Sequence, residues 1–179
     1  MSKRNTIILV TVLCLGVFIW FAQKKYVSYN SEMRIKSPAF EDGGKIPSRY
    51  TCDGEELSPE LIFQEVPKEA HSLALIVDDP DTTVGTWDHF VLWNISPSAP
   101  GIEENSVPKG AVVGQNSWPK NEYGGPCPPE GSHRYFFKLY ALDTAFNLPA
   151  TSGSTDLQRA MGGHILAEAE LMGKYERQK

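Results

Sequence analysis

The 179-residue chain has few of the residue spacings that mark common chemical sites. Its three cysteines form no CxxC or CxH pair, and its four histidines form no HxH or HExxH spacing, so a metal site is not indicated. No serine lies in a GxSxG elbow, and Cys127 lies between two prolines with no helix start after it, so an activated nucleophile is missing. The sequence therefore predicts neither an enzyme nor a cofactor or metal.

Long apolar runs are also scarce, with one exception near the N-terminus. Residues 6–22 carry no charge, and a run of this length is about the shortest helix that crosses a hydrocarbon core of roughly 30 Å. Residues 1–25 are therefore predicted to be a transmembrane anchor or signal segment. Bulky Trp20 disfavours cleavage at the end of the run, and Cys14 follows Leu13 instead of the small residue that lipidation needs. An uncleaved anchor with the domain outside the cytoplasm is preferred, and a cleaved signal peptide with a secreted protein is the alternative.

Basic residues are few once this segment is set aside. Residues 1–30 hold four Lys and Arg and no Asp or Glu, which leaves 13 basic and 22 acidic residues and a net charge of −9 in the remainder. Nucleic-acid binding needs basic surface that displaces counterions. No nucleic-acid partner is therefore predicted, although a local basic pocket is compatible with this balance.

No repeat, low-complexity tract or second linker divides the rest of the chain. Residues 26–34 are interpreted as a linker and residues 35–179 as one domain. Short runs rich in β-branched and aromatic residues at 71–79, 89–96 and 134–143 predict strands separated by turns. The expected fold is mainly β, a two-sheet antiparallel Greek-key β-sandwich with one or two short helices.

The C-terminal region predicts a helix and then a strand. Thr155 and Gln158 fit a capping box, and apolar residues follow at helical spacing to about Ile165. Residues 167–175 then alternate between two sets of side chains with the period of a half-buried strand, although their composition favours helix. Residues 96–132 contain seven of the 13 prolines and no long strand, which is typical of a fixed functional loop.

Two polar clusters occur where a strand meets a loop. Asp79 and Asp81 end one strand and His89 starts the next, so the turn could bring a carboxylate to this histidine, although Asp is also an ordinary turn residue. His133 and Tyr135 begin a third strand and share one face, because side chains alternate. Imidazoles, a phenol and the backbone N–H groups of a Gly-rich turn favour capture of a small phosphate or carboxylate.

The domain also carries two cysteines in loops flanked by Gly and Pro. Cys52 and Cys127 could form one disulfide in an exported domain, which would stabilise it by about 2–4 kcal/mol. Two independent thiols are the alternative, and the sequence leaves both open.

The motifs resemble the phosphatidylethanolamine-binding protein family. DPD followed by His89 and Phe90, and the stretch GGPCPPEGSHRYFFKLYALD, are similar to its two signature regions. CDGEELSPEL, GQN and GHILAEAELMGKYER are similar to its bacterial and archaeal branch, often labelled Raf-kinase-inhibitor-like. The resemblance covers about residues 35–177. It implies a β-sandwich of two antiparallel sheets with a small anion pocket at one end and no established catalysis.

The resemblance also implies the residues of this pocket. Gly125 would lie at the rim, where its N–H reaches the anion, while Arg134 would alternate to the opposite face and form an ion pair. This chain reads DPDTT without the usual third-position proline, so a looser turn is expected. The implied ligand residues are Asp79, Asp81, His89, Gly125, Pro128, Pro129, His133 and Tyr135.

Members of the family bind phospholipid headgroups and phosphorylated small molecules, and several inhibit kinases or proteases. The predicted function is therefore non-catalytic binding of a small anionic ligand or phospholipid headgroup by a membrane-tethered domain. The alternative is a protein inhibitor of an envelope protease, another hydrolase or a kinase. A hydrolase that uses His and Asp is a third reading, which the missing nucleophile and metal disfavour.

Overall fold

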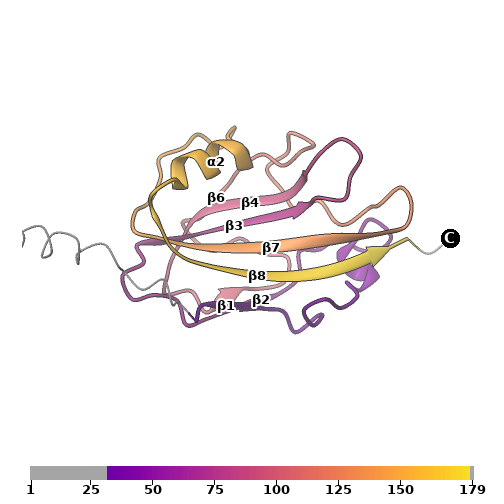
Figure 1. Cartoon of the computed structure of the whole chain (residues 1–179), viewed down its shortest axis with the longest axis horizontal. Helices are drawn as coiled ribbons and strands as arrows, with labels where there is room; N and C mark the ends of the chain where they lie inside the picture. Colours follow the sequence, from indigo (N-terminus) through magenta and orange to yellow (C-terminus); the bar gives the residue numbers. More distant parts are fainter. Residues whose placement is uncertain (1–31, 178–179) are drawn as a thin grey trace, which may run out of the picture. The chain divides into compact units, whose positions relative to one another are not determined.

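Two antiparallel sheets face each other, and their main strands follow the apolar runs of the sequence (Figure 1). The computed structural model describes residues 32–177. The smaller sheet has the order β1-β2-β5 and the larger one β6-β4-β3-β7-β8, so β7 crosses over to lie beside β3. The expected mainly β fold with two antiparallel sheets is confirmed. The strands are β1 Arg34–Lys36, β2 Leu61–Gln64, β3 Ser72–Asp79, β4 Trp87–Ile95, β5 Gly101–Ile102, β6 Val112–Val113, β7 Ser132–Leu142 and β8 Ile165–Glu176.

The central strand, β3, is covered on both faces. All eight of its residues are buried, since one face meets the core between the sheets and the other meets a second apolar cluster that includes Leu157 and Met161 of helix α2 (Ser154–Met161). A strand covered on both sides reads as a continuous apolar run. This burial is why residues 71–79 show little alternation.

The long strands β7 and β8 alternate between buried and more exposed residues. In β7, Tyr135, Phe137 and Leu139 are buried, and the residues between them are partly exposed. β8 shows the same alternation over most of its length, so the strand predicted for 167–175 is confirmed. The strand period outweighs the helical composition of this segment because one of its faces is buried against the core.

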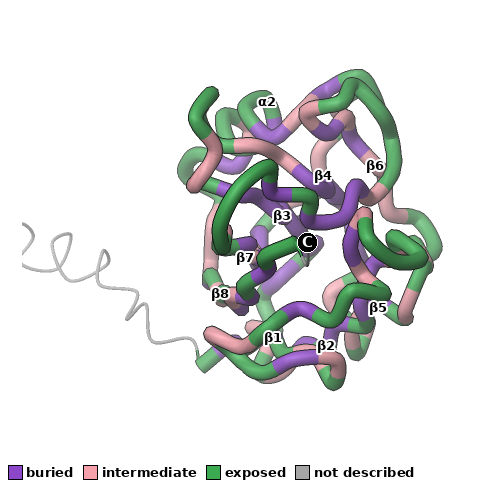
Figure 2. Tube along the Cα trace, turned by 90° about the vertical axis from the view of Figure 1, so that its right-hand side faces the viewer, coloured by how far each residue is buried: buried purple, intermediate pink, exposed green. Residues whose placement is uncertain are grey.

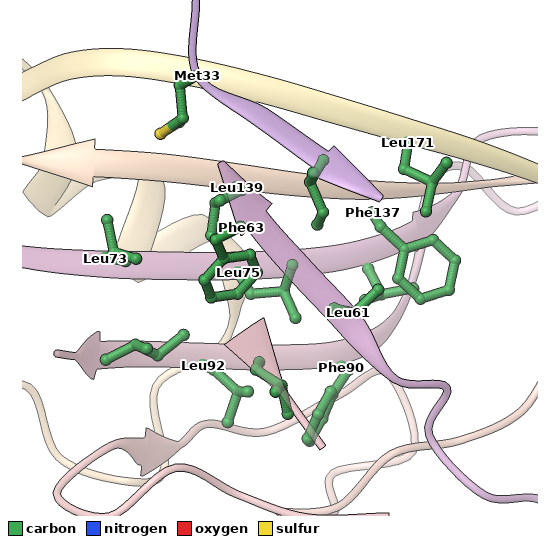
Figure 3. Close-up of a cluster of buried hydrophobic side chains, with 14 of the residues drawn as sticks. Met33, Leu61, Phe63, Leu73, Leu75, Phe90, Leu92, Phe137, Leu139 and Leu171 are labelled. Atoms are coloured by element: carbon green, nitrogen blue, oxygen red, sulfur yellow. The ribbon is translucent and has the colours of Figure 1, made fainter. Parts of the chain in front are cut away.

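The core lies between the two sheets (Figure 3). Figure 2 shows the buried residues along the strands and the exposed residues in the turns and loops. The largest contributions come from apolar side chains on facing strands. They include Leu61 and Phe63 of β2, Leu73 and Leu75 of β3, Phe90 and Leu92 of β4, Phe137 and Leu139 of β7, and Leu171 of β8.

The connection between β4 and β7 touches both sheets. Its two short strands pair with different partners, β5 with β2 and β6 with β4. The expectation of no long strand in residues 96–132 is therefore met. This double attachment ties the connection to both sheets.

Helix α2 differs from the prediction at both ends. The capping box at Thr155 and Gln158 is wrong, because the N-cap is Gly153 and no side chain caps the helix. The helix ends at Met161, several residues before Ile165, which is the first residue of β8. A second short helix is the 3₁₀ turn η2, Ser48–Tyr50.

The predicted N-terminal segment, residues 1–25, lies outside the described residues. Within residues 32–177, no helix is both long and apolar enough to cross a membrane. β1 begins at Arg34, inside the predicted linker 26–34, and Met33 already belongs to the core.

Candidate functional site

A cavity of about 460 Å³ opens where the turn after β3, the start of β7 and the long β4–β7 connection meet. Seven of the eight predicted ligand residues lie around it, which brings together two motifs separated by more than 30 residues of sequence. Gly125 is the eighth and does not line the cavity. The seven are Asp79, Asp81, His89, Pro128, Pro129, His133 and Tyr135.

The buried Asp79 carboxylate orients His133. Its Oδ2 accepts a hydrogen bond from His133 Nδ1 at 2.7 Å, and its Oδ1 accepts the backbone N–H of Asp81 at 2.8 Å. The prediction that this turn brings a carboxylate to His89 is therefore wrong, because the His89 ring bonds the Gly124 carbonyl oxygen. The adjacency of β3 and β7 brings Asp79 to His133 instead.

The second carboxylate, Asp81, pairs with Arg134. The guanidinium donates from Nη2 to Oδ1 at 2.6 Å and from Nε to Oδ2 at 3.0 Å, and the backbone N–H of Arg134 adds a bond at 2.9 Å. These bonds, the guanidinium's first, lower the pKa of Asp81 to about 2. Arg134 does not line the cavity and forms an ion pair, as expected, and both carboxylates of the DPD motif thus have partners of their own.

His89 is buried and fixed by the backbone. Its Nδ1 lies 2.6 Å from the carbonyl oxygen of Gly124, and since a carbonyl only accepts, Nδ1 carries the hydrogen. Burial lowers the pKa of His89, so the ring is neutral near pH 7. The rings of Trp118 and Tyr135 meet it edge to face, with centroids at 5.3 and 5.2 Å.

Two further polar atoms beside the cavity are buried without a hydrogen-bond partner. They are the Tyr135 hydroxyl and Trp87 Nε1. Burial raises the pKa of Tyr135, and the nearby Asp79 carboxylate raises it further, so the hydroxyl keeps its proton. This hydroxyl makes no hydrogen bond of full geometry within the described residues. Buried donors of this kind are rare in folded proteins and mark places where a ligand can supply the acceptor.

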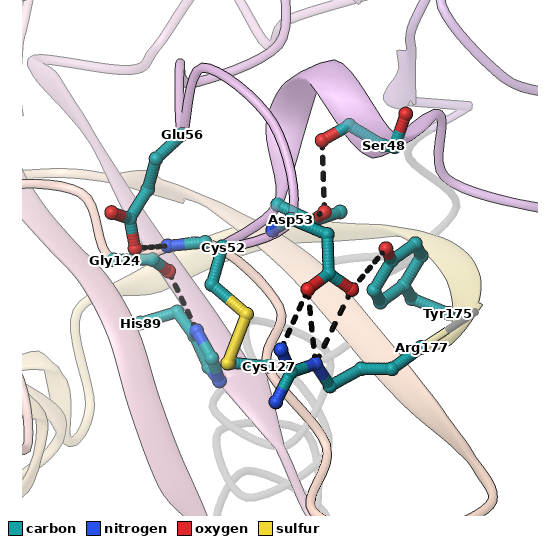
Figure 4. Close-up of a disulfide and its surroundings, with 11 residues drawn as sticks. Ser48, Cys52, Asp53, Glu56, His89, Gly124, Cys127, Tyr175 and Arg177 are labelled. Atoms are coloured by element: carbon teal, nitrogen blue, oxygen red, sulfur yellow. Dashed lines mark hydrogen bonds and ion pairs between the residues drawn. A yellow bond between two sulfur atoms is a disulfide. The ribbon is translucent and has the colours of Figure 1, made fainter. Parts of the chain in front are cut away.

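The loop that carries Pro128 and Pro129 is held from several sides (Figure 4). Cys127 forms a disulfide with Cys52, and the Cys52 N–H donates to the Pro126 carbonyl oxygen at 3.2 Å. The sequence left open whether these cysteines form a disulfide or remain two independent thiols, and in the structure they form the disulfide. On the other side, the Gly124 N–H donates to the carbonyl oxygen of His89 at 2.9 Å.

The Cys52 side of this staple is anchored to the C-terminal end of the fold. Asp53 accepts hydrogen bonds from Arg177 Nη2 at 2.8 Å and from the Tyr175 hydroxyl at 2.7 Å (Figure 4). The same arginine and tyrosine lower the pKa of Asp53. The disulfide therefore connects the cavity wall to strand β8 through the turn that follows η2.

Gly125 has a different role from the one expected. Its N–H donates to Glu56 Oε1 at 3.2 Å, so it is not directed at a ligand in the cavity. A Cβ at this position would lie 2.9 Å from backbone atoms of Tyr50 and Thr51. Close approach of two backbone segments, rather than anion contact, therefore requires the glycine.

Other cavity residues were missed at the level of sequence. Trp87 precedes His89 by two positions on β4, so side-chain alternation offered a signal for it. Trp118 comes from the β4–β7 connection and had no local signal; its ring meets that of Trp87 edge to face, with centroids 5.4 Å apart. The additional lining residues are Thr82, Thr83, Val84, Trp87, Trp118, Cys127 and Glu130.

Comparison with known proteins decides the family. The sequence pattern of the family described as phosphatidylethanolamine-binding protein matches residues 36–176. The chain belongs to the phosphatidylethanolamine-binding protein family. Its members include bacterial and archaeal relatives. The chain is 52% identical over 150 residues to a UPF0098 protein of Methanothermobacter thermautotrophicus, which covers 81% of this chain and 99% of the relative.

Solved structures of the family agree with the fold. A putative phosphatidylethanolamine-binding protein homologue from Chlamydia trachomatis is 42% identical, with a TM-score of 0.80, and the match covers 83% of this chain and 100% of that one. YbcL of Escherichia coli, described as a member of the mammalian family, is 28% identical, with a TM-score of 0.77 over 82% of this chain and 99% of its own. The family resemblance read from the two motifs is thus confirmed.

Proposed function

We propose that the protein binds a small anionic ligand, a phosphate ester or phospholipid headgroup, in the cavity, and that it does so without catalysis. The observation that carries the proposal is the pairing of both acidic side chains of the DPD motif. An unpaired carboxylate would repel a phosphate, but Asp79 accepts from His133 and from a backbone N–H, and Asp81 is paired with Arg134. Such pairing leaves the imidazole, hydroxyl and indole groups of the wall to meet an anion.

Binding without turnover is supported by the chemistry of the cavity wall. Cys127 is held in a disulfide, so it offers no thiolate. The Asp79–His133 pair has the form of an oriented base, yet none of the described residues that line the cavity is a serine or a cysteine thiol. Turnover of any phosphoester that is lost in His133→Ala would contradict this part of the proposal.

The test is a titration with phenyl phosphate followed by amide NMR. We expect the amide signals of Asp79, His89, His133 and Tyr135 to shift, while those of α2 stay in place. His133→Gln should weaken binding about tenfold, because it removes a group that donates to a charged ligand. His164→Gln is the matched control, since His164 bonds Asp143 at 2.8 Å outside the cavity. Saturating ligand without shifts at the four cavity residues would refute the proposal.

We also propose that the domain is held at a membrane on its non-cytoplasmic side. Two observations support this location: the uncharged run at residues 6–22 and the Cys52–Cys127 disulfide, a bond that persists mainly in oxidising compartments. Fractionation of cells that express the full chain should place it in the membrane fraction. Added protease should digest it from the outer face of the membrane; protection in intact spheroplasts would contradict the proposed side.

A second candidate function is inhibition of an envelope hydrolase by the β4–β7 connection. One observation favours it: Ile62 and Val107 are 38% and 46% exposed and line a second hollow of about 640 Å³ away from the cavity. Val107→Asp should abolish inhibition of a co-purified hydrolase, whereas His133→Gln should leave it unchanged. Loss of inhibition in the His133 variant alone would place the inhibitory contact at the cavity.

A further inference from the structure

We infer that the cavity selects an anion that also donates a hydrogen bond, which is a singly protonated phosphomonoester, over phosphodiesters and sulfate esters. The inference rests on the proposed function and names its ligand class. It comes from the fixed orientation of His89, from the charges around that ring and from the chemistry of the three kinds of ester.

The orientation of His89 leaves one nitrogen that only accepts. The Gly124 carbonyl oxygen, 2.6 Å away, fixes the hydrogen on Nδ1. The residue is 3% exposed, and its burial favours the neutral ring, which has a single N–H. Nε2 is then a bare acceptor on a ring that lines the cavity, and no described residue donates to it. Among ligands that fill the cavity, one with a hydrogen on its anionic group can satisfy this nitrogen directly.

The charged groups that act on His89 are three carboxylates, and His133 lines the same cavity. Asp79 comes from β3, Asp88 from β4 itself and Glu56 from the turn after η2, and Tyr135 of β7 packs against the ring as a neutral phenol. Glu130 adds a carboxylate to the cavity wall. This surplus of negative charge opposes a dianion more strongly than a monoanion.

Beyond this first set, the remaining cavity groups divide between acceptors already in use and donors. Asp81 is occupied by Arg134, and Asp79 by His133. The Tyr135 hydroxyl is a buried donor close to the Asp79 carboxylate, but it makes no hydrogen bond of full geometry within residues 32–177. The cavity therefore offers donors for an oxyanion together with a buried, oriented acceptor, Nε2 of His89, and the Glu130 carboxylate on its wall.

A phosphomonoester in its singly protonated form matches both halves of this set. It has unprotonated oxygens for the donors and one P–O–H for His89 Nε2. A phosphodiester and a sulfate monoester carry the same single charge but have no hydrogen on the anionic group. The second pKa of a phosphomonoester is about 6, so the required form is about half of the total at pH 6 and about a tenth at pH 7.

The experiment compares three soluble probes on the full-length protein: phenyl phosphate, phenyl sulfate and methyl phenyl phosphate. Calorimetric titrations are carried out at pH 6, 7 and 8. At pH 6, phenyl phosphate should bind about tenfold more tightly than phenyl sulfate or methyl phenyl phosphate, because these two leave His89 Nε2 unsatisfied. The advantage should shrink towards pH 8, where only about 1% of the phosphomonoester keeps its second proton. The ratio of phosphate to sulfate affinity at each pH reduces the contribution of the protein's own groups, because both probes meet the same protein.

A spectroscopic readout needs no variant and so does not depend on whether a His89 substitution folds. The ¹⁵N shift of His89 Nε2 should be that of a bare nitrogen in the free protein. It should move towards the hydrogen-bonded value with phenyl phosphate and stay in place with phenyl sulfate. A protonated Nε2 in the free protein at pH 7 would overturn the inference.

Vesicle co-sedimentation separates a lipid from a soluble source of the same chemistry. Phosphatidic acid is a monoester and phosphatidylglycerol a diester, so binding to the first above the second supports the inference with a lipid as source. Tight binding of phenyl phosphate with no preference between vesicles supports it with a soluble source. If phenyl phosphate, phenyl sulfate and methyl phenyl phosphate bind equally well at the cavity, the selectivity is overturned and the proposed function stands. If none of the three binds, both the proposed function and the selectivity are refuted.

Discussion

Replacement of the cysteine pair tests how the cavity wall is held. Cys52 and Cys127 are separated by 75 residues of sequence, and in the chain-entropy model a closed loop of that length stabilises the folded state by about 4.5 kcal/mol. Native disulfides typically contribute about 2–4 kcal/mol, and a domain of this size loses about 2–4 °C of Tm per kcal/mol. The Cys52→Ala/Cys127→Ala variant should therefore melt about 5–15 °C below the unmodified protein.

The same substitution should loosen the cavity without removing every contact of its loop. The backbone bond from Cys52 to Pro126 and the bond from Gly125 to Glu56 do not need the sulfur atoms. We therefore expect a folded variant with native-like circular dichroism and weaker ligand binding. Calorimetric melting with and without reductant is the assay.

The double variant provides its own control. Reductant should lower the Tm of the unmodified protein to about that of the variant and should leave the variant unchanged. A Tm difference below about 2 °C between the oxidised protein and the variant would refute the reasoning, because it would mean that the loop is equally restrained without the covalent bond.

Three further perturbations address single groups. Burial lowers the pKa of His89 in the folded protein below its ordinary value of 6.5, so the unfolded chain takes up the proton first. The free energy of unfolding should therefore fall as the pH drops below about 6.5. Urea unfolding at pH 7.5 and 5.5 measures this fall, and His89→Gln should lessen it. Arg134→Gln should lower stability by less than about 1 kcal/mol, since its pair is exposed, yet weaken phenyl phosphate binding severalfold by leaving Asp81 unpaired; unchanged affinity would contradict the electrostatic argument. Gly125→Ala should cost about 1–3 kcal/mol in urea unfolding, because its Cβ would crowd the backbone of Thr51 at 2.9 Å; a neutral effect would show that this contact yields easily.

The sequence by itself determined the strands and the membership of the family. Composition and periodicity are local properties, so the short apolar runs at 71–79 and 134–143 and the alternation at 167–175 predict strands before any partner is known. Because side chains alternate along a strand, His133 and Tyr135 share one face, and both line the cavity. The ends of helix α2 were predicted less well, because the N-cap is a glycine without a side chain to recognise.

Only the tertiary structure decided which groups pair at the site. Asp79 and His133 are 54 residues apart, and they meet because β7 crosses over to lie beside β3. Trp118 reaches the cavity through a connection that touches both sheets, and Gly125 is turned away from the cavity by its bond to Glu56. Sheet order and loop placement depend on packing across the whole core, so no local pattern encodes these contacts, whereas the strand period is fixed by each segment alone.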